Sequence, residues 1–359
     1  MGQAAYIYER RLMHRDELDT PALTVDLDIM EDNICRLQAY CDAHGLALRP
    51  HIKTHKVPAI AHRQVRAGAR GIACQKLGEA KVFAAAGFDD ILIPYNIVGP
   101  AKLERLARLS TQCRLIVAAD SLATVRGLAH AAALAARPLD VILELEGEIE
   151  RAGVSTPAEA VELAQAVARS PYLAYRGVMI YPSTPRSAPR LQAFLDALAA
   201  AGLPAEIVSG GGTGPAFQSH LVPGLTEIRV GTYVYNDWTT VTQGHCRPEQ
   251  CAQKVICTVV SRPTPTRAIL DGGSKTFSSD GPLPMGQIVE YPEAAIYRMS
   301  EEHAHVDISR CAHKPEVGER VHVIANHACA VSNLHDVVYG LRGDRVEVVW
   351  PILARGKVQ

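Results

Sequence analysis

The residues Arg49-Pro50-His51-Ile52-Lys53-Thr54-His55-Lys56 decide how the rest of the chain is interpreted. They follow an apolar run, Leu46-Ala47-Leu48, that predicts a buried strand, and they precede Pro58, which suits the first turn of a helix. A lysine at the carboxyl end of a strand lies where α/β barrels carry their chemistry. Two lysines and two histidines close together, with partial burial, favour the neutral amine, which can form a Schiff base. The alternative interpretation is a solvated basic loop, which only the rest of the chain can exclude.

The chain beyond this stretch alternates between strand-like apolar runs and helix-like amphipathic runs. Gly68, Gly87 and Gly202 end helical runs, as expected at helix C-termini. We expect strands over residues 46–52, 70–74, 90–94, 114–119, 140–145, 175–181, 205–209 and 226–230, and helices over residues 57–68, 77–86, 100–109, 121–136, 157–169, 187–201 and 214–220. This alternation predicts a (β/α)₈ TIM-type barrel. A doubly wound sheet is the alternative, but it usually has fewer strands, and the chain lacks an early glycine-rich dinucleotide motif.

The pattern changes after Asn236, where helical periodicity fades and short β-type runs begin. Gly-Pro punctuation separates these runs, as in residues 281–284. An early strand over residues 23–27 fits the same β-rich part of the chain. We therefore predict a barrel domain over residues 28–237 and a β-rich C-terminal domain in which residues 1–27 join residues 238–359.

The composition is that of an ordinary globular protein of 359 residues, 48% of them hydrophobic and 21% charged. A net charge of −1 gives no indication of a nucleic-acid partner or of a membrane surface, and no apolar run reaches the ~18 residues of a membrane span. The first residues lack the features of a signal peptide, and nine cysteines without paired spacing fit reduced thiols. We expect a cytoplasmic protein with no nucleic-acid and no membrane partner.

Glycines follow the last two predicted barrel strands. The seventh strand leads into Ser209-Gly210-Gly211-Gly212-Thr213-Gly214, and the eighth ends in Arg229-Val230-Gly231-Thr232-Tyr233. Barrels often hold a phosphate with backbone amides at these two positions. Lys53 would then face a bound phosphate across the barrel mouth. A phosphorylated aldehyde held by a lysine is pyridoxal 5'-phosphate (PLP).

With these features the chain resembles the fold-type III PLP enzymes, the alanine racemase-like family that includes D-serine dehydratase and D-threonine aldolase. The resemblance extends from Thr20-Pro21 to the C-terminus and is most specific at residues 49–56 and at Asn326-His327-Ala328-Cys329. It implies that Lys53 holds PLP covalently. It also implies cofactor-binding roles for Arg151, Tyr181, Gly211, Gly212, Thr213, Arg229, Gly231 and Thr232.

For three of these positions the resemblance implies a specific role toward the cofactor. Arg151 matches an arginine near the cofactor phenolate oxygen, and Tyr181 ends the sixth strand, where the family places a ring against the pyridine. Arg229 matches the racemase arginine that faces the pyridine nitrogen, where a permanent positive charge would leave that nitrogen unprotonated and weaken the cofactor as an electron sink. The alternatives are a strand-end ion pair for Arg229 and a packed barrel tyrosine for Tyr181.

His327 and Cys329 form a candidate metal site. In an extended chain, residues i and i+2 point to one side, so imidazole and thiolate can bind one ion together. Taken alone, a buried histidine and a buried cysteine are the alternative interpretation. D-serine dehydratases have a metal-binding His-x-Cys here, whereas D-threonine aldolases typically have His-x-Asp. The resemblance implies a divalent metal, with zinc preferred by a thiolate and manganese or magnesium suited to oxygen ligands.

The resemblance implies a lyase that uses PLP and a metal on small β-hydroxy-D-amino acids. Cys329 is similar to the dehydratases, whereas residues 333–336 and His55 are more similar to the aldolases. We expect retro-aldol cleavage of a carbon–carbon bond to glycine and an aldehyde. Dehydration, a carbon–oxygen cleavage that gives a keto acid and ammonia, is the alternative. An amino-acid racemase is less favoured, because it has no use for the His-x-Cys pair. A non-catalytic PLP-binding protein is less favoured, because such proteins lack a second domain.

The base that acts on the β-hydroxyl is an open assignment. Residues 182–186 lack the histidine that some aldolases carry there. The candidates are His51, His55, His303 and His305. The resemblance also implies a homodimer in which each β-rich domain covers the barrel mouth of its partner.

Overall fold

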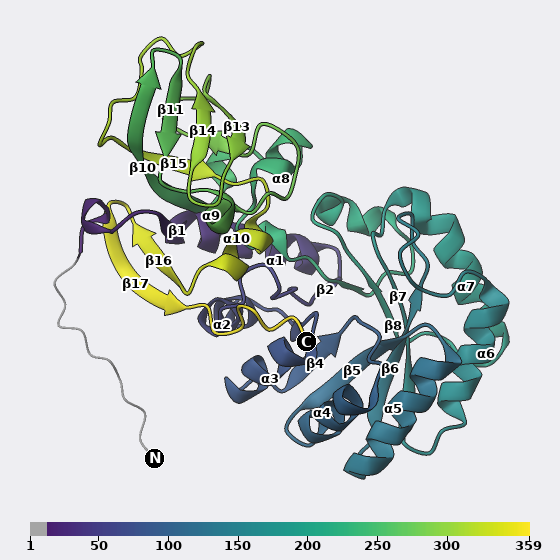
Figure 1. Cartoon of the computed structure of the whole chain (residues 1–359). Helices are drawn as coiled ribbons and strands as arrows, with labels where there is room; N and C mark the ends of the chain where they lie inside the picture. The colour runs from purple at the N-terminus through teal and green to yellow at the C-terminus, as the bar shows by residue number, and fades with distance from the viewer. Residues whose placement is uncertain (1–12) are drawn as a thin grey trace, which may run out of the picture.

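The structure, a computed structural model, describes residues 13–359. Its larger part is a barrel of eight parallel strands surrounded by helices (Figure 1). The strands are β2 (Ala47–Leu48), β3 (Ile72–Ala73), β4 (Asp90–Ile93), β5 (Arg114–Ala119), β6 (Leu139–Leu145), β7 (Leu173–Ile180), β8 (Ile207–Gly210) and β9 (Glu227–Ile228). Their order is β2-β9-β8-β7-β6-β5-β4-β3. A bridge between His51 and Ala73 joins the two ends of this sheet, so the predicted barrel is confirmed.

Helices follow the strands much as the sequence predicts. They are α2 (Pro58–Arg66), α3 (Leu77–Ala85), α4 (Pro100–Ser110), α5 (Leu122–Ala135), α6 (Pro157–Ala168) and α7 (Ala188–Ala200). Four of them, α2, α4, α6 and α7, have proline in the first turn, where the missing N–H leaves no hydrogen bond unmade. The helix expected over residues 214–220 is present as the 3₁₀ helix η3 (Ala216–Leu221) rather than as an α-helix.

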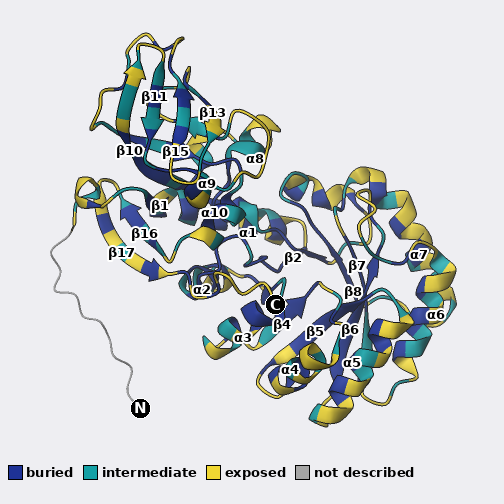
Figure 2. Ribbon diagram, viewed as in Figure 1, coloured by how far each residue is buried: buried dark blue, intermediate teal, exposed yellow. Residues whose placement is uncertain are grey.

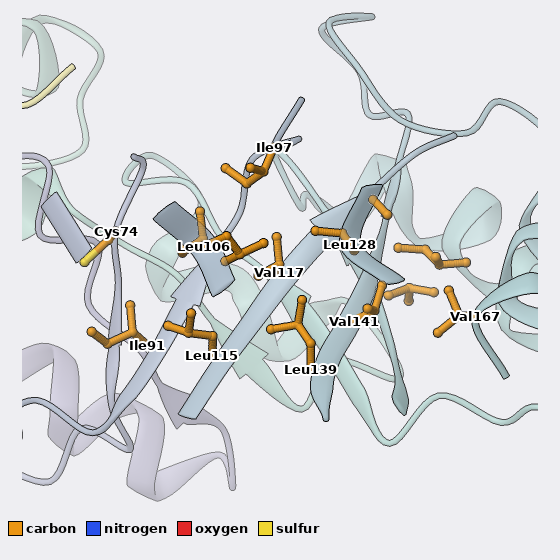
Figure 3. Packing of buried hydrophobic residues seen from close by; sticks show 14 of the residues in the cluster. Cys74, Ile91, Ile97, Leu106, Leu115, Val117, Leu128, Leu139, Val141 and Val167 are labelled. Atoms are coloured by element: carbon orange, nitrogen blue, oxygen red, sulfur yellow. The ribbon is translucent and has the colours of Figure 1, made fainter. Parts of the chain in front are cut away.

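Alternating residues of the barrel strands pack on opposite faces of the sheet. On β5, Leu115 and Val117 face outward, where they meet Leu106 of α4 and Leu128 of α5 (Figure 3). Ile116 belongs to a separate cluster inside the barrel. Figure 2 shows the result, with buried strands surrounded by helices whose outer faces are exposed. The period of two therefore fills a core on both faces of the sheet.

The second part of the structure is a nine-stranded mixed sheet (Figure 1). It comprises β1 (Ala22–Asp26), β10 (Gln253–Thr264), β11 (Arg267–Leu270), β12 (Gln287–Ile288), β13 (Ala295–Met299), β14 (Ala304–Asp307), β15 (Arg320–Ile324), β16 (Val337–Arg342) and β17 (Arg345–Pro351). The early strand β1 pairs with β10 and β16, far from it in sequence. The N-terminal strand is thus part of the β-rich sheet. Residues 1–12, which the sequence assigns to the same domain, lie outside the described residues.

The helix α1 (Leu27–Ala43) connects the two parts. Asp26 caps it, because its carboxylate accepts a hydrogen bond from the backbone N–H of Ile29 at 3.1 Å. Its buried residues Leu27, Met30 and Leu37 share one cluster with the mixed sheet. Short helices complete the described chain: η1 (Arg15–Glu17), η2 (Pro185–Ser187), η4 (Thr232–Val234), α8 (Trp238–Thr242), η5 (Pro248–Gln250), α9 (Ser274–Phe277) and α10 (Ala328–Leu334).

Two general expectations concern the whole chain. Within residues 13–359, no helix combines the length and the apolar character needed to cross a membrane. The nine cysteines, all within the described residues, are free thiols.

Candidate active site

A cavity of about 230 Å³ lies at the carboxyl ends of the barrel strands, where α/β barrels hold their chemistry. It is lined by His51, Lys53, Gln75, Pro94, Arg151, Met179, Tyr181, Gly212, Thr213, Arg229, Gly231, Thr232, His327 and Cys329. Most of these residues follow barrel strands, and the last two come from the start of α10. The structure thus brings together most of the sequence-predicted site residues. Gly211, His55 and His303 do not line the cavity.

Lys53 and Lys56 have different surroundings. Lys53 lines the cavity, in a turn where the N–H of Lys56 donates to the carbonyl of Ile52 at 2.8 Å. Lys56 is buried away from the cavity, and its Nζ lies 2.8 Å from Oε1 of Glu79. Of the two lysines in residues 49–56, Lys53 is the one with access to a bound cofactor.

His51 lines the cavity beside Lys53. Its Nε2 lies 2.9 Å from Oε1 of Gln75, on the loop after β3. Burial, together with the positive charge of Lys53, holds the pKa of His51 well below its ordinary value. His51 is therefore a neutral imidazole at neutral pH, which can accept a proton.

Arg229 follows β9 and is buried in the cavity wall. Its Nη2 donates to the carbonyl of Ile180 at 3.2 Å, whereas its Nη1 is buried without a hydrogen-bond partner. Burial lowers the pKa of Arg229 to about 10, so the group stays charged at neutral pH. An unsatisfied buried donor is costly unless a ligand completes it. The unprotonated pyridine nitrogen of PLP is an acceptor of the required kind.

Arg151 and Tyr181 lie at the mouth of the cavity. The Arg151 guanidinium lies 5.1 Å from the centroid of the Tyr181 ring and 3.7 Å from a carboxylate oxygen of Glu144. Burial raises the pKa of Glu144, and Arg151 opposes that shift. Both mouth residues are partly exposed, with 52% of the Arg151 side chain accessible. They form an open rim rather than a closed wall.

The glycines after β8 and β9 lie where the backbone passes close to neighbouring atoms, with no room for a side chain. Gly211 and Gly212 have φ values of +141° and +135°, and a Cβ at Gly211 would lie 2.3 Å from the carbonyl oxygen of Arg229. A Cβ at Gly231 would lie 2.7 Å from Oγ1 of Thr54. Because η3 replaces the predicted α-helix, loop amides and the hydroxyls of Thr213 and Thr232 are the groups available to a phosphate.

His327 and Cys329 meet at the start of α10. Contact with Cys329, and then with the carboxylate of Asp280, raises the pKa of His327 to about 9. Burial is the largest influence on the Cys329 thiol and opposes its ionisation, but the hydrogen bond and charge of His327, together with Thr54 and Lys53, lower its pKa overall. The expected extended geometry is wrong, because His327 is the N-cap of α10 and Cys329 lies in its first turn. The two side chains nevertheless converge.

The His327–Cys329 pair suits a metal ion that keeps open positions. Among residues 13–359, no three His, Cys, Asp or Glu side chains gather in a metal-binding arrangement. An imidazole with a thiolate of lowered pKa matches the preferences of zinc. Nδ1 of His327 hydrogen-bonds Oδ2 of Asp280, a pairing that orients metal-binding histidines. The remaining positions would be available to water or substrate.

His55, a candidate base in the sequence analysis, does not lie in the cavity. It is fully buried, its Nε2 lies 3.2 Å from Oε1 of Gln64, and burial lowers its pKa to about 3. The chain at residues 52–56 turns as a helix does, so residues two apart point to different sides. His55 therefore faces away from the cavity that Lys53 lines.

His303 and His305 lie in the β-rich part, outside the cavity. His303 is exposed in the connection between β13 and β14. His305 lies on β14, and its Nε2 is 3.3 Å from Oγ of Ser300. Among the histidine candidates for the base, His51 is the one that lines the cavity.

Gln75 and Asp280 are site residues that the sequence analysis missed. Gln75 follows the predicted strand 70–74, so its position at a barrel strand end was a usable signal. Asp280 lies in a Gly-Pro-rich loop without periodicity, and nothing in the sequence connects it to His327.

Two known sequence patterns match the chain. The pattern of the alanine racemase N-terminal domain matches residues 25–237, more than half of the chain. The chain belongs to this family. A second pattern, described as a putative serine dehydratase domain, matches residues 252–341. The alanine racemase-like barrel and the β-rich part thus correspond to two recognised sequence units.

Individual relatives span nearly the whole chain. A D-threonine aldolase from Arthrobacter sp. is 34% identical over 94% of this chain and 93% of its own length. A solved D-threonine aldolase from Filomicrobium marinum superposes with a TM-score of 0.90 at 32% identity, over 97% of this chain and 99% of that one. A D-threo-3-hydroxyaspartate dehydratase from Delftia sp. is 31% identical over 93% of this chain and 97% of its own length.

The dehydratase has also been solved as single-residue variants. One variant replaces a histidine by alanine, and another replaces a cysteine two positions further along by alanine and is described as metal-free. The same spacing separates His327 and Cys329 in this chain.

Proposed function

We propose that this protein is a PLP- and divalent-metal-dependent lyase that cleaves the Cα–Cβ bond of β-hydroxy-D-amino acids, giving glycine and an aldehyde. One observation carries the proposal: a single cavity is lined by Lys53, by Arg229, whose Nη1 has no hydrogen-bond partner, and by the His327–Cys329 pair. These are the groups needed to hold a PLP cofactor and a metal beside one substrate. The aldolase relatives support the same reaction.

PLP, when bound, supplies an aldehyde that condenses with amines and a conjugated ring that withdraws electrons from Cα. Lys53 would provide the amine that anchors it and could move a proton at Cα. Arg229 would offer an N–H to the ring nitrogen and, as a cation, would disfavour protonation there. Backbone amides at Gly212 and Gly231, with the hydroxyl of Thr213, would bind the phosphate.

His327 and Cys329 would hold a metal whose Lewis acidity stabilises negative charge on the substrate β-oxygen. Asp280 orients the imidazole of His327. We assign acceptance of the β-hydroxyl proton to His51, because it is the histidine candidate that lines the cavity. A base of this kind is needed for Cα–Cβ cleavage, since the hydroxyl must become a carbonyl.

Dehydration is the second candidate, and Cys329 is the observation that favours it. The His-x-Cys spacing matches the two positions substituted in the D-threo-3-hydroxyaspartate dehydratase variants. In this reaction Lys53 would remove the Cα proton, and His327 and Cys329 would hold the metal whose Lewis acidity would stabilise the departing hydroxide. The products would be a keto acid and ammonia.

The two reactions are distinguished by their products. The purified protein is incubated with PLP and either D-threonine or D-serine, after EDTA treatment and after addition of zinc or manganese. Cleavage releases glycine from both substrates, whereas dehydration releases 2-oxobutanoate or pyruvate. Absence of both product classes with either metal would reject the lyase assignment.

We also propose a cytoplasmic homodimer. Free cysteines suit a reducing compartment. The exposed rim formed by Arg151 and Tyr181 leaves the cavity open to water in a single chain, and a partner could cover it.

A further inference from the structure

Lys56 lies outside the cavity in a setting that is unusual for lysine. Its Nζ lies 2.8 Å from Oε1 of Glu79, and both residues are buried, Glu79 with 1% exposure. Its backbone φ is +57°, in the left-handed region that residues other than glycine seldom adopt. A buried ion pair and a left-handed lysine are both costly, so they persist only where the surrounding structure determines them.

The second carboxylate oxygen of Glu79 joins Lys56 to the start of α3. Oε2 accepts hydrogen bonds from the backbone N–H groups of Gln75 at 2.7 Å and of Lys76 at 3.2 Å. These groups lie where β3 leads into α3. One buried carboxylate therefore binds two loops at the carboxyl end of the barrel, the turn after β2 and the loop after β3.

Gln75 extends this connection to the cavity. Its Oε1 lies 2.9 Å from Nε2 of His51, and the N–H of Lys53 is 3.5 Å from Nδ1 of the same imidazole. The turn carrying Lys53 is thus held on both sides by Glu79. On one side Glu79 binds Lys56 directly, and on the other it fixes Gln75, which binds His51.

The C-terminal segment holds the same turn from outside. The carbonyl of Lys56 accepts from the N–H of Ala354 at 3.2 Å, and its Nζ donates to the carbonyl of Ala354 at 3.4 Å. Two residues on, the N–H of Gly356 donates to Oδ1 of Asn333 on α10 at 2.8 Å. The C-terminus lies against the barrel beside α3 (Figure 1). The Lys53 turn and the helix of the candidate metal ligands therefore share one support.

We propose that Glu79 is a positioning residue that fixes the turn presenting Lys53 to the cavity. This inference rests on the proposed function, in which Lys53 holds PLP. The same ion pair separates the two lysines chemically. The Nζ of Lys56 is engaged by Glu79 and by the carbonyl of Ala354 outside the cavity, so Lys53 is the amine that a cofactor in the cavity can reach.

The test compares Glu79→Gln with Asp140→Asn in the PLP-loaded protein. Asp140 is a buried carboxylate that accepts hydrogen bonds from Arg114 at 2.9 Å and Arg176 at 2.8 Å, at the start of β6 and away from the cavity. Glu79→Gln should lower kcat by roughly 100-fold with little change in KM, because a misplaced reacting group costs about that much. It should also weaken the visible circular dichroism of bound PLP. Asp140→Asn should lower only the thermal unfolding midpoint.

A double variant separates positioning from stability. Glu79→Gln combined with Lys56→Met removes the unpaired buried charge, so the unfolding midpoint should recover while kcat and the circular dichroism stay low. Recovery of all three would show that Glu79 acts only through stability and would overturn the proposal.

Hydrogen exchange over residues 51–56 distinguishes this proposal from the proposed function, because it does not depend on catalysis. Faster exchange in Glu79→Gln than in Asp140→Asn is expected. If that occurs while the wild-type protein neither binds PLP nor cleaves D-amino acids, the positioning of the turn stands and the proposed function fails. Unchanged exchange and unchanged kcat in an otherwise active enzyme would refute the positioning role alone.

Discussion

Oγ1 of Thr54 lies 3.2 Å from Sγ of Cys329, although 275 positions separate the two residues in the chain. Thr54 adjoins Lys53, and Cys329 is a candidate metal ligand at the start of α10. The contact therefore joins the turn of the proposed cofactor-binding lysine to the helix of the proposed metal ligands. A substrate amine at Lys53 and a β-oxygen at the metal are separated by two carbon atoms, so a reaction that uses both needs this proximity.

Replacing Lys53 by alanine should abolish the visible absorbance band of bound PLP and all lyase activity. Lys53 lines the cavity, whereas Lys56 is paired with Glu79 outside it. The measurement is an absorbance spectrum after PLP addition and dialysis, followed by borohydride reduction and peptide mapping. Lys56→Met serves as the matched lysine control and should keep the band. A reducible adduct on Lys56 in the wild-type protein would contradict the assignment.

Replacing Cys329 by alanine should remove metal-dependent activity on β-hydroxy-D-amino acids and leave the PLP spectrum unchanged. The thiol has a lowered pKa and lies beside His327, but the groups proposed to bind PLP are different residues. Metal content and product formation are measured together. Cys35→Ala, at an exposed cysteine of α1, is the control and should behave as wild type. Full activity of Cys329→Ala in the presence of EDTA would rule out a metal-dependent lyase and favour the racemase alternative.

Asp280→Asn should weaken metal binding by roughly 10–100-fold without removing a metal ligand. The carboxylate hydrogen-bonds Nδ1 of His327, and so sets the ring orientation and the basicity of its other nitrogen. Competition with a fluorescent zinc chelator gives the dissociation constant. Asp344→Asn, at an exposed carboxylate 3.0 Å from Arg15, should leave it unchanged. Equal zinc affinity in both variants would exclude Asp280 from this role.

The barrel and the glycine-rich loops after β8 and β9 could be predicted because each depends on local pattern. Strand and helix periodicity located the strands that end at Lys53, Tyr181 and Arg229, and barrel geometry brings strand ends together whatever their spacing in sequence. The glycines at positions 211 and 212 were recognisable because side chains rarely adopt their backbone conformation.

The errors arose where local pattern and tertiary contact differ. His55 was expected beside Lys53, but a helical turn sends it into the packing around Gln64. His327 and Cys329 were expected in extended chain after a strand and instead begin a helix, whose first N–H at Ala328 donates to the buried carboxylate of Asp237 at 3.2 Å. Asp280 lies in an irregular loop and hydrogen-bonds His327. Because the loop has no periodic pattern, this contact could not be predicted from the sequence.

The buried neutral His55 should make the protein less stable in acid. Its pKa is about 3 in the folded state and ~6.5 in an unfolded chain. Between these two pH values only the unfolded state gains a proton. The stability it contributes is present above pH 6.5 and is lost as pH falls toward 3. The free energy of unfolding should therefore decrease by up to about 1.4 kcal/mol per pH unit for this group.

Urea unfolding across this pH range measures the effect. His55→Gln, which cannot take up a proton, should flatten the dependence, although His51 contributes with the same sign because burial also lowers its pKa. His313→Gln, at an exposed histidine, is the control and should retain the wild-type slope. Parallel slopes for wild type and His55→Gln would show that His55 is not a neutral buried group.

The last prediction concerns assembly. The cavity opens at the strand ends, and its rim residues Arg151 and Tyr181 are partly exposed in the single chain. Lyase intermediates on PLP require exclusion of water, so a second chain should cover this mouth. One two-fold axis closes two such mouths with a self-complementary interface. Light scattering should therefore give about twice the chain mass of 38.8 kDa at micromolar concentration.

Mixing two inactive variants tests whether the site is shared between chains. If His303 of one chain reaches the cavity of the other, Lys53→Ala and His303→Ala dimers should each be impaired, and mixed dimers should contain one intact site. Random mixing makes half of the dimers mixed, so activity should recover to about one quarter of wild type. Mixing Lys53→Ala with Cys329→Ala is the control, because Thr54 contacts Cys329 within one chain and both variants therefore damage the cavity of their own chain. In mixed dimers of that pair each cavity still carries one defect, so no recovery is expected. A fully active monomer would show that each chain closes its own site.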